Sequence, residues 1–351
     1  MKKTVPIIIC LLITYLATAI AQNVAYNFTN KVTFTKSGNG HISKFIGMLP
    51  LPISNLYQDI ANLTYSGGEE IVEGRYGNHV LMADRSDFPG SQYVMSSSFA
   101  IHPISVKVDV SNITSIPDYD PNSEPCRLHL GNRREYIVTS NPYIVETGDK
   151  LWKQSKDVLD YARRCYEHVA KNFRYINGSW RTLSQILKEG GGECGDFSTL
   201  VVNLLRYKGI PSRHNICLRL NGGYHVWVDF YIEDYGWIPL DAQYKNANPN
   251  GDYFGVYDGA CIIVAQDFCY DISEEYPVDI LQAYSYWNWY DSGQCSISGK
   301  HEFYKTEVAT GVESLSISPA ADAYNLQGMK VSSEYKGIVI SNGKKIYLQS
   351  K

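Results

Sequence analysis

Apolar residues recur at every second position over much of the segment from residue 23 to residue 110, which is the period of a half-buried β-strand. The clearest run comprises Tyr26, Phe28, Val32 and Phe34. A later run comprises Ile104, Val106, Val108 and Val110. Glycine-containing turn signals separate such runs, for example at 66–68 and 76–78. The pattern predicts a small antiparallel β-sandwich domain over residues 22–115.

A helical period replaces the alternation in the middle of the chain. We predict an amphipathic helix over 151–173, a short helix over 180–187, and a third helix that begins at Cys194. The run Lys-Gly-Ile-Pro at 208–211 ends the third helix, because Gly adopts the left-handed cap and Pro cannot continue a helix. The glycine run at 190–192 turns the chain sharply, so Cys194 is expected at the N-terminus of its helix.

Strand patterns return after the third helix. We expect strands over 215–220 and 224–232, and a further strand that ends at Asp241. His225 and Asp241 would then lie near the ends of two neighbouring antiparallel strands, where their side chains can meet. Helices followed by an antiparallel sheet predict an α+β domain, which we place at 116–295 after a proline-rich linker.

The two ends of the chain have patterns of their own. Residues 1–21 match a secretory signal, with Lys2 and Lys3 before an apolar run and Ala-Ile-Ala at its end. That run is too short for a typical bilayer span, so we expect an exported protein without a stable membrane span. Residues 296–351 form a β-rich tail in which Asn342-Gly343 predicts a hairpin. The tail is either a sorting segment or a plain terminal hairpin.

Charge and cysteine content narrow the function classes. Lys and Arg number 32 against 36 Asp and Glu, and no basic block is present, so a nucleic-acid partner is not expected. Of the 8 cysteines, Cys10 lies in the signal. The odd number that remains is consistent with one free thiol and up to three disulfides of undetermined pairing. We expect no cofactor or metal, since residues 118–129 lack the Gly and Glu of a calcium loop.

Cys194, His225 and Asp241 supply the three groups that acyl transfer from an amide needs: a nucleophile, a base, and a group that orients the base. A helix N-terminus favours negative charge, so the thiolate of Cys194 forms more easily there. His225 would accept the thiol proton, and Asp241 would fix the imidazole tautomer. The backbone N–H of Cys194 is the expected oxyanion donor.

Four motifs make the chain resemble the transglutaminase-like superfamily. They are Gly192-Glu193-Cys194-Gly195-Asp196-Phe197, Gly209-Ile210-Pro211-Ser212-Arg213, His225-Val226-Trp227-Val228 and Gly236-Trp237-Ile238-Pro239-Leu240-Asp241. The resemblance is specific between about residues 151 and 241. It implies a papain-like α+β core preceded by the β-sandwich, a Cys194, His225 and Asp241 triad, and thioester chemistry on amides.

The resemblance also implies an aromatic residue upstream of the nucleophile that assists the oxyanion. Trp180 is the nearest candidate, and the alternative is that it serves as a core residue. Ala242 and Gln243 follow Asp241 where Pro-Thr or Pro-Ser is usual in the family, so the loop after the triad is expected to differ. No calcium-site pattern like that of animal transglutaminases is present in the sequence, and calcium activation is therefore not expected.

The sequence predicts an exported cysteine hydrolase that acts on a peptide or protein substrate, with or without attached glycan. Tyr224, Trp227 and Trp237 are candidates to line the substrate cleft, although packing of the sheet explains such aromatic residues equally well. Two alternatives stay open. One is a binding module for peptide or glycan on the same fold, and the other is a protein cross-linking transglutaminase. The oligomeric state is not encoded in any pattern that we find.

Overall fold

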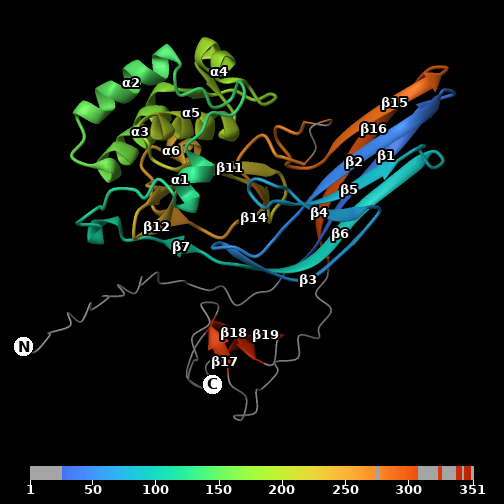
Figure 1. Ribbon diagram of the computed structural model, residues 1–351, viewed down its shortest axis with the longest axis horizontal. Coiled ribbons are helices and arrows are strands. Elements are labelled where there is room, and N and C mark those ends of the chain that lie inside the picture. The colour runs from blue at the N-terminus through green and yellow to red at the C-terminus, as the bar shows by residue number, and fades with distance from the viewer. Residues whose placement is uncertain are drawn as a thin grey trace, which may run out of the picture. The chain divides into compact units, whose positions relative to one another are not determined.

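The computed structural model describes residues 26–272, 275 and 277–306, and the backbone of three short strands further on (Figure 1). The chain divides into two compact units, residues 1–306 and 307–351. The predicted signal at 1–21 lies outside the described residues. None of the helices in the described part is long and apolar enough to cross a membrane.

Residues 26–103, together with residues 285–306, form a sandwich of two four-stranded antiparallel sheets. One sheet has the order β16 (Cys295–Thr306), β1 (Tyr26–Gly38), β6 (Gln92–Pro103) and β3 (Gln58–Ser66). The other has the order β15 (Ser285–Ser292), β2 (His41–Leu51), β5 (His79–Arg85) and β4 (Glu69–Val72). Alternate side chains from both sheets, such as Phe34 and Phe45, meet in a shared core. The alternating pattern therefore identified this part correctly.

Two strands of the sandwich come from residues that follow the α+β part. β15 pairs with β2, and β16 pairs with β1 from Thr306 to Cys295. β15 lies before and β16 lies after the boundary that we predicted between 295 and 296, so that boundary falls inside the sandwich rather than between two domains. The strand predicted over 104–110 is reduced to β7 (Val106–Lys107), which pairs with β13 (Val256–Tyr257). The Asp109 carboxylate caps a short 3-10 turn, η1 (Val110–Asn112), which ends the extended backbone.

Helices and a third four-stranded antiparallel sheet make up the middle of the chain, which confirms the predicted α+β class (Figure 1). The helices are α1 (Glu124–His129), α2 (Pro142–Lys153), α3 (Val158–Asn172), α4 (Leu183–Glu189), α5 (Cys194–Tyr207) and α6 (Ala242–Ala247). The sheet has the order β12 (Gly236–Leu240), β11 (Tyr224–Ile232), β10 (Ser212–Arg219) and β14 (Cys261–Gln266). Residues 195–206 of α5 are all buried, so this helix is the centre of the core.

The helix predicted over 151–173 is two helices. α2 ends at Lys153, and the Asp157 carboxylate caps the start of α3 by accepting a hydrogen bond from the Asp160 backbone N–H. A carboxylate at this position satisfies one of the unpaired N–H groups of a helix start, so it breaks the helix that periodicity alone joins. The helix predicted over 180–187 begins at Leu183 instead, after a capping box formed by Thr182.

The sandwich fixes the sheet that carries His225. The side chain of Gln58 both donates to the backbone oxygen of Ile263 at 2.8 Å and accepts from its N–H at 2.7 Å, as a neighbouring strand would. The Tyr57 hydroxyl donates to the buried Asp229 carboxylate of β11 at 2.5 Å. Such buried polar contacts allow few alternative geometries, so they fix the position of the sheet relative to the sandwich.

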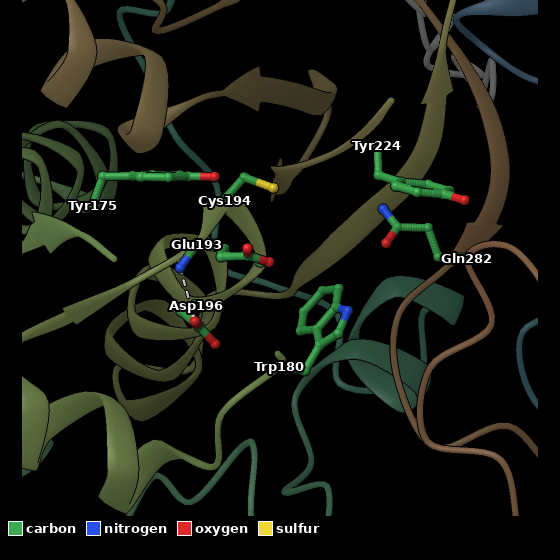
Figure 2. A pocket seen from close by; sticks show the side chains of 8 residues that line it. Tyr175, Trp180, Glu193, Cys194, Asp196, Tyr224 and Gln282 are labelled. Atoms are coloured by element: carbon green, nitrogen blue, oxygen red, sulfur yellow. Dashed lines mark hydrogen bonds between the residues drawn. The ribbon is translucent and has the colours of Figure 1, made fainter. Parts of the chain in front are cut away.

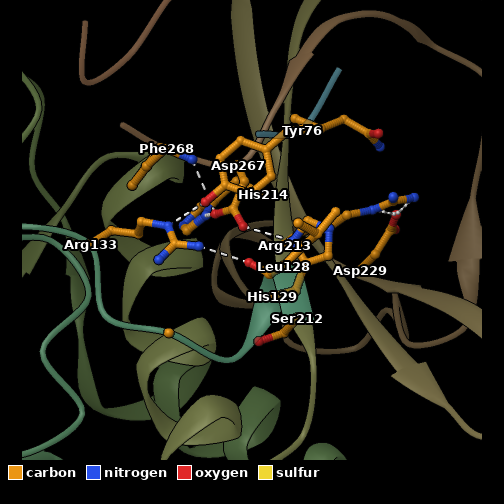
Figure 3. A network of polar contacts seen from close by, with 12 residues as sticks. Tyr76, Leu128, His129, Arg133, Ser212, Arg213, His214, Asp229, Asp267 and Phe268 are labelled. Atoms are coloured by element: carbon orange, nitrogen blue, oxygen red, sulfur yellow. Dashed lines mark hydrogen bonds and ion pairs between the residues drawn. The ribbon is translucent and has the colours of Figure 1, made fainter. Parts of the chain in front are cut away.

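A buried ionic network lies at the other end of α5 (Figure 3). Its centre is Asp267, which is fully buried and pairs with Arg206 of α5 at 2.5 Å. The same carboxylate binds His129 of α1 at 2.8 Å and His214 of β10 at 3.5 Å. We call these four residues the Asp267 cluster. It joins two helices, a strand and the loop after β14.

Residues 307–351 contain β17 (Ala323–Asn325), β18 (Gly337–Ser341) and β19 (Lys344–Leu348), which form one antiparallel sheet. Ser341 pairs with Lys344, which confirms the hairpin predicted from Asn342-Gly343. These two turn residues themselves lie outside the described residues. β8 (Arg174–Tyr175) and β9 (Gly191–Gly192) form a separate short parallel pair in the first unit.

Candidate active site

Three consecutive glycines place Cys194 as the first residue of α5. Gly190 has a φ of 68° and closes α4 with the left-handed cap that glycine adopts without strain. A Cβ on Gly191 would lie 2.0 Å from the backbone oxygen of Arg174, and one on Gly192 would lie 2.1 Å from the Asp196 carboxylate. Any side chain would therefore displace the turn that presents Cys194.

Asp196 ties the loop before α4 to the start of α5. It is 1% exposed, and it accepts hydrogen bonds from the backbone N–H groups of Glu193 at 2.8 Å and Arg181 at 3.1 Å. Its carboxylate also pairs with the Arg181 guanidinium at 3.0 Å. The aspartate of the cysteine motif is therefore a structural anchor, and it fixes the position of Trp180 next to Arg181.

Trp180 lies directly beside the residue that follows Cys194. A Cβ on Gly195 would be 2.1 Å from the Cη2 atom of the Trp180 ring, so only glycine at this position lets the ring approach Cys194. Phe268 packs edge-on against the indole, with 5.1 Å between ring centroids. The glycine after the cysteine and the aromatic residue upstream of it thus form a single packing unit.

His225 and Asp241 meet as the strand pattern predicted. β11 pairs with β12, and Asp241 follows the last residue of β12. The His225 Nε2 atom lies 2.5 Å from Asp241 Oδ2, and both residues are buried. This bond leaves the Nδ1 atom of the ring for Cys194, whose side chain is within hydrogen-bonding reach of His225.

The pKa of His225 is raised. Burial alone lowers the pKa of a histidine, but the charge and hydrogen bond of Asp241 and the adjacent Cys194 outweigh it and raise the pKa of His225 to about 10. An imidazole with this pKa is protonated at neutral pH. It can therefore stabilise a thiolate on Cys194 as an ion pair.

A cavity of about 210 Å³ opens beside Cys194 (Figure 2). It is lined by Tyr175, Trp180, Glu193, Cys194, Gly195, Asp196, Tyr224 and Gln282. Of the aromatic residues singled out from the sequence, Trp180 and Tyr224 line the cavity, and in Figure 2 both lie on the opposite side of Cys194 from Tyr175. Tyr224 is 45% exposed, so its ring is accessible from solvent.

Trp227 and Trp237 lie away from this cavity, which corrects their placement in the substrate cleft. Trp227 is 3% exposed and stacks on Tyr257 at 4.7 Å between ring centroids. Trp237 packs against the guanidinium of Arg213, whose Cζ is 4.0 Å from the ring centroid. Because other parts of the chain cover both faces of the sheet, Trp227 is a core residue although it lies on the same face of β11 as His225 and only two positions away.

Tyr175, Gln282 and Tyr244 belong to the site and were not predicted. Tyr175 is on β8, and Gln282 lies in the segment before β15, where its amide is 3.5 Å from the backbone oxygen of His225. The ring of Tyr244 stacks on the imidazole of His225. None of the three lies in one of the four recognised motifs. The only sequence signal is position, since Tyr244 follows the capping residue Asp241 by three.

The site also contacts the sandwich. The Tyr224 hydroxyl is 2.7 Å from Nδ1 of His301 on β16, and Nε2 of His301 is 2.6 Å from the side-chain oxygen of Asn30 on β1. Burial lowers the pKa of His301 to about 4, so its ring is neutral at pH 7. Nε2–H then donates to Asn30, and Tyr224 donates to Nδ1. One wall of the cavity is therefore held by the sandwich.

The cysteines of the described part are all unpaired. They are Cys126, Cys165, Cys194, Cys217, Cys261, Cys269 and Cys295. None of the disulfides that the cysteine count allows is therefore present in this structure. Cys194 and Cys295 are half-buried and the other five are buried. Among the described residues, no group of His, Cys, Asp or Glu is arranged to hold a metal ion.

Comparison with known proteins matches the part of the chain that contains Cys194, His225 and Asp241. Residues 146–242 match the family profile of the transglutaminase-like superfamily. An uncharacterised protein of Haemophilus influenzae is 22% identical over 263 residues, which cover 62% of this chain and 68% of that protein.

Two solved structures extend the comparison. One is described as a putative cysteine protease from Cytophaga hutchinsonii, with a TM-score of 0.55 and 17% identity over 82% of this chain and 93% of that one. At this identity the likeness concerns the fold alone. The other is the periplasmic domain of TgpA from Pseudomonas aeruginosa, with a TM-score of 0.35 and 13% identity over 68% of this chain and 96% of that one.

Proposed function

Because residues 146–242 of this chain belong to the transglutaminase-like superfamily, we propose that the protein is an exported cysteine-dependent enzyme that hydrolyses peptide or amide bonds through a thioester on Cys194. One observation carries the proposal. Cys194 begins a buried helix beside a histidine that is bonded to an aspartate, and the same cysteine lines a cavity. The groups proposed as nucleophile, base and orienting residue therefore lie close together, next to a cavity that can hold a substrate.

Acylation follows from these positions. The thiol proton passes to Nδ1 of His225, and the thiolate attacks the acyl carbon of the substrate. The C–N bond breaks as the His225 imidazolium donates its proton to the leaving amine. Asp241 accepts from Nε2–H throughout, so the imidazole keeps the orientation and tautomer that both proton transfers require.

Charge on the acyl oxygen is stabilised at the start of α5. As the first residue of the helix, Cys194 has a backbone N–H without an acceptor inside the helix, so this group is available to donate to the acyl oxygen. Trp180 lines the same cavity and is the candidate for a second donor. Water then attacks the thioester, with His225 as base, and releases the carboxylic acid and the free thiol.

The acceptor distinguishes hydrolysis from cross-linking, since either water or a lysine amine can attack the same thioester. The proposed test is incubation of the full chain with a complex peptide mixture and with a fluorescent primary amine, with Cys194→Ala as the matched control. We expect new peptide termini with the wild-type chain, none with Cys194→Ala, and no uptake of the amine.

Each other outcome has a defined meaning. Uptake of the amine into glutamine-containing proteins would replace hydrolysis by cross-linking. If neither reaction occurs and iodoacetamide modifies Cys194 no faster than a simple thiol, the catalytic proposal fails and a peptide-binding role remains. Recovery of the protein only in the cytosolic fraction of its source cells would contradict export.

A further inference from the structure

A tyrosine outside the recognised motifs covers one face of the candidate catalytic imidazole. The rings of Tyr244 and His225 have centroids 4.4 Å apart and planes that differ by 14°, which is a parallel stack. Tyr244 belongs to α6, the short helix that begins directly after Asp241. We infer that Tyr244 is a positioning residue that orients the His225 imidazole and favours its protonated form.

One carboxylate holds both members of the stack. Asp241 Oδ2 binds Nε2 of His225 at 2.5 Å, and Asp241 Oδ1 accepts from the backbone N–H of Tyr244 at 2.8 Å. The second bond is the N-cap of α6, and it places the side chain of the third helical residue above the first turn. The position of the tyrosine ring is therefore set by the same group that sets the imidazole.

The stack supplies a constraint that Asp241 cannot. A single hydrogen bond at Nε2 leaves the imidazole free to rotate about the axis of that bond. Contact with a parallel ring removes this freedom, because rotation would drive the imidazole edge into the tyrosine face. The Nδ1 atom is then held toward Cys194, the other group in reach of the His225 side chain.

The π face of Tyr244 also favours a positive charge on the His225 imidazole. Aromatic faces attract a cation within about 6 Å, and the attraction is larger at sites that exclude water. His225 is 2% exposed, so the imidazolium meets Tyr244 with little competing solvent. The stack therefore adds to the effect of Asp241, which also favours the charged ring.

Further contacts fix the tyrosine ring itself. The Arg219 guanidinium of β10 donates to the Tyr244 hydroxyl at 2.7 Å, and Tyr253 packs edge-on at 5.5 Å between centroids. Burial raises the pKa of the Tyr244 hydroxyl, so it remains neutral and can accept this bond. Apart from Arg219, the ionisable groups around His225 are Asp241, Cys194 of α5 and Cys217 of β10, whose thiol bonds the His225 backbone oxygen at 3.2 Å.

The test uses two substitutions that differ in the ring alone. Tyr244→Phe keeps the aromatic face and loses the bond to Arg219, whereas Tyr244→Leu removes the face. The measurement is an NMR titration of the histidine rings in the full chain, with the His225 signal assigned by its absence in His225→Gln. We expect the pKa of His225 to fall by about one unit in Tyr244→Leu and by less than about 0.3 in Tyr244→Phe.

A second readout follows the thiol. The rate of alkylation of Cys194 by iodoacetamide at pH 7 should fall in Tyr244→Leu and be restored in Tyr244→Phe. Equal values for both variants, with folding verified by circular dichroism, would overturn the inference. If Tyr244→Leu does not fold, Tyr244→Trp and Tyr244→Gln give the same comparison, and a His225 pKa that does not depend on an aromatic ring overturns it.

The inference rests on the proposed function, because it concerns the same cysteine and histidine, but the two fail separately. Neither readout needs a substrate. If His225 of the wild-type chain titrates near the ordinary value of 6.5, the ion pair and the proposed chemistry fail together. If the wild-type value is high and the ring substitutions leave it unchanged, the role of Tyr244 alone is excluded.

Discussion

The chain contains two buried histidine–aspartate arrangements that look alike at first. In one, His225 meets Asp241 at 2.5 Å, and in the other His129 meets Asp267 at 2.8 Å. Both histidines are at most 5% exposed. Hydrogen bonding and burial therefore do not distinguish the candidate catalytic pair from the Asp267 cluster.

The charge on the aspartate does distinguish them. Asp267 pairs with the fully buried Arg206, so its negative charge is already neutralised, and burial lowers the pKa of His129 to about 4. Among the described residues, Asp241 has no Lys or Arg partner, and the pKa of His225 rises to about 10 despite burial. A buried His–Asp pair thus becomes a charged pair or a neutral scaffold according to whether a third residue neutralises the carboxylate.

The largest predicted effect is the loss of that neutralising cation. In Arg206→Met the Asp267 carboxylate remains buried without a permanent positive partner. Breaking a buried ion pair from one side typically costs about 3–5 kcal/mol, and we expect a loss of this size in the free energy of unfolding at pH 7. Urea denaturation followed by tryptophan fluorescence measures it. The pKa of His129 should rise at the same time, since Arg206 contributes to lowering it.

A matched control is Arg163→Met, which makes the same replacement in a partly exposed ion pair. Arg163 pairs with Asp252 at 2.7 Å, and the Asp252 side chain is 55% exposed. Such pairs contribute about 1 kcal/mol or less. Similar losses in both variants would mean that the burial of the Asp267 cluster does not determine its energetic role.

The next prediction concerns the His225–Asp241 pair, in which a substitution removes the negative charge of Asp241. Asp241→Asn keeps an oxygen that can cap α6, but it loses the negative charge that favours the His225 imidazolium. Alkylation of Cys194 by iodoacetamide at pH 7 should then slow, because each unit lost from the pKa of His225 lowers the equilibrium constant of the thiolate–imidazolium pair by about tenfold.

The stability of Asp241→Asn separates the two His–Asp pairs further. We expect Asp241→Asn to change the free energy of unfolding by less than Arg206→Met, because no ionised group is left buried without a partner at neutral pH. An unchanged alkylation rate in a folded Asp241→Asn chain would show that Asp241 does not control the charge of His225.

The His225–Asp241 pair and Cys194 were predictable from the sequence because each of the three residues lies in a short pattern that can be recognised locally. Cys194 follows three glycines at a helix start, and His225 and Asp241 occupy the ends of strands whose alternation is readable. The β-sandwich was readable for the same reason. Its last strands were not, because β15 and β16 pair with residues about 240–280 positions away and no local pattern specifies such a partner.

The Asp267 cluster was not predicted at all. His129, Arg206, His214 and Asp267 share no motif, and each is an unremarkable polar residue until the fold brings them together. The same limit explains Trp227, which strand alternation placed with His225 but which the sandwich covers through Tyr57. Periodicity gives the face of a strand, whereas only the tertiary structure shows what covers that face.

The smallest predicted effect concerns the neutral histidine. The pKa of His129 is about 4 in the folded chain against 6.5 ordinarily, so below pH 6.5 the unfolded chain binds a proton that the folded chain does not. Stability must then fall as the pH falls from 6.5 toward 4, and His129 accounts for about 1.8 kcal/mol of the loss between pH 7 and pH 5.

His129→Asn tests this contribution, because asparagine keeps an N–H donor for Asp267 and does not titrate. The variant is expected to be less stable than the wild-type chain at pH 7, since it loses the stack of His129 on Tyr76, which has 5.4 Å between centroids. The difference between the two chains should shrink by about 1.8 kcal/mol at pH 5. A difference that stays constant from pH 7 to pH 5 would mean that the pKa of His129 is the same in the folded and the unfolded chain, and that burial beside the neutralised Asp267 does not lower it.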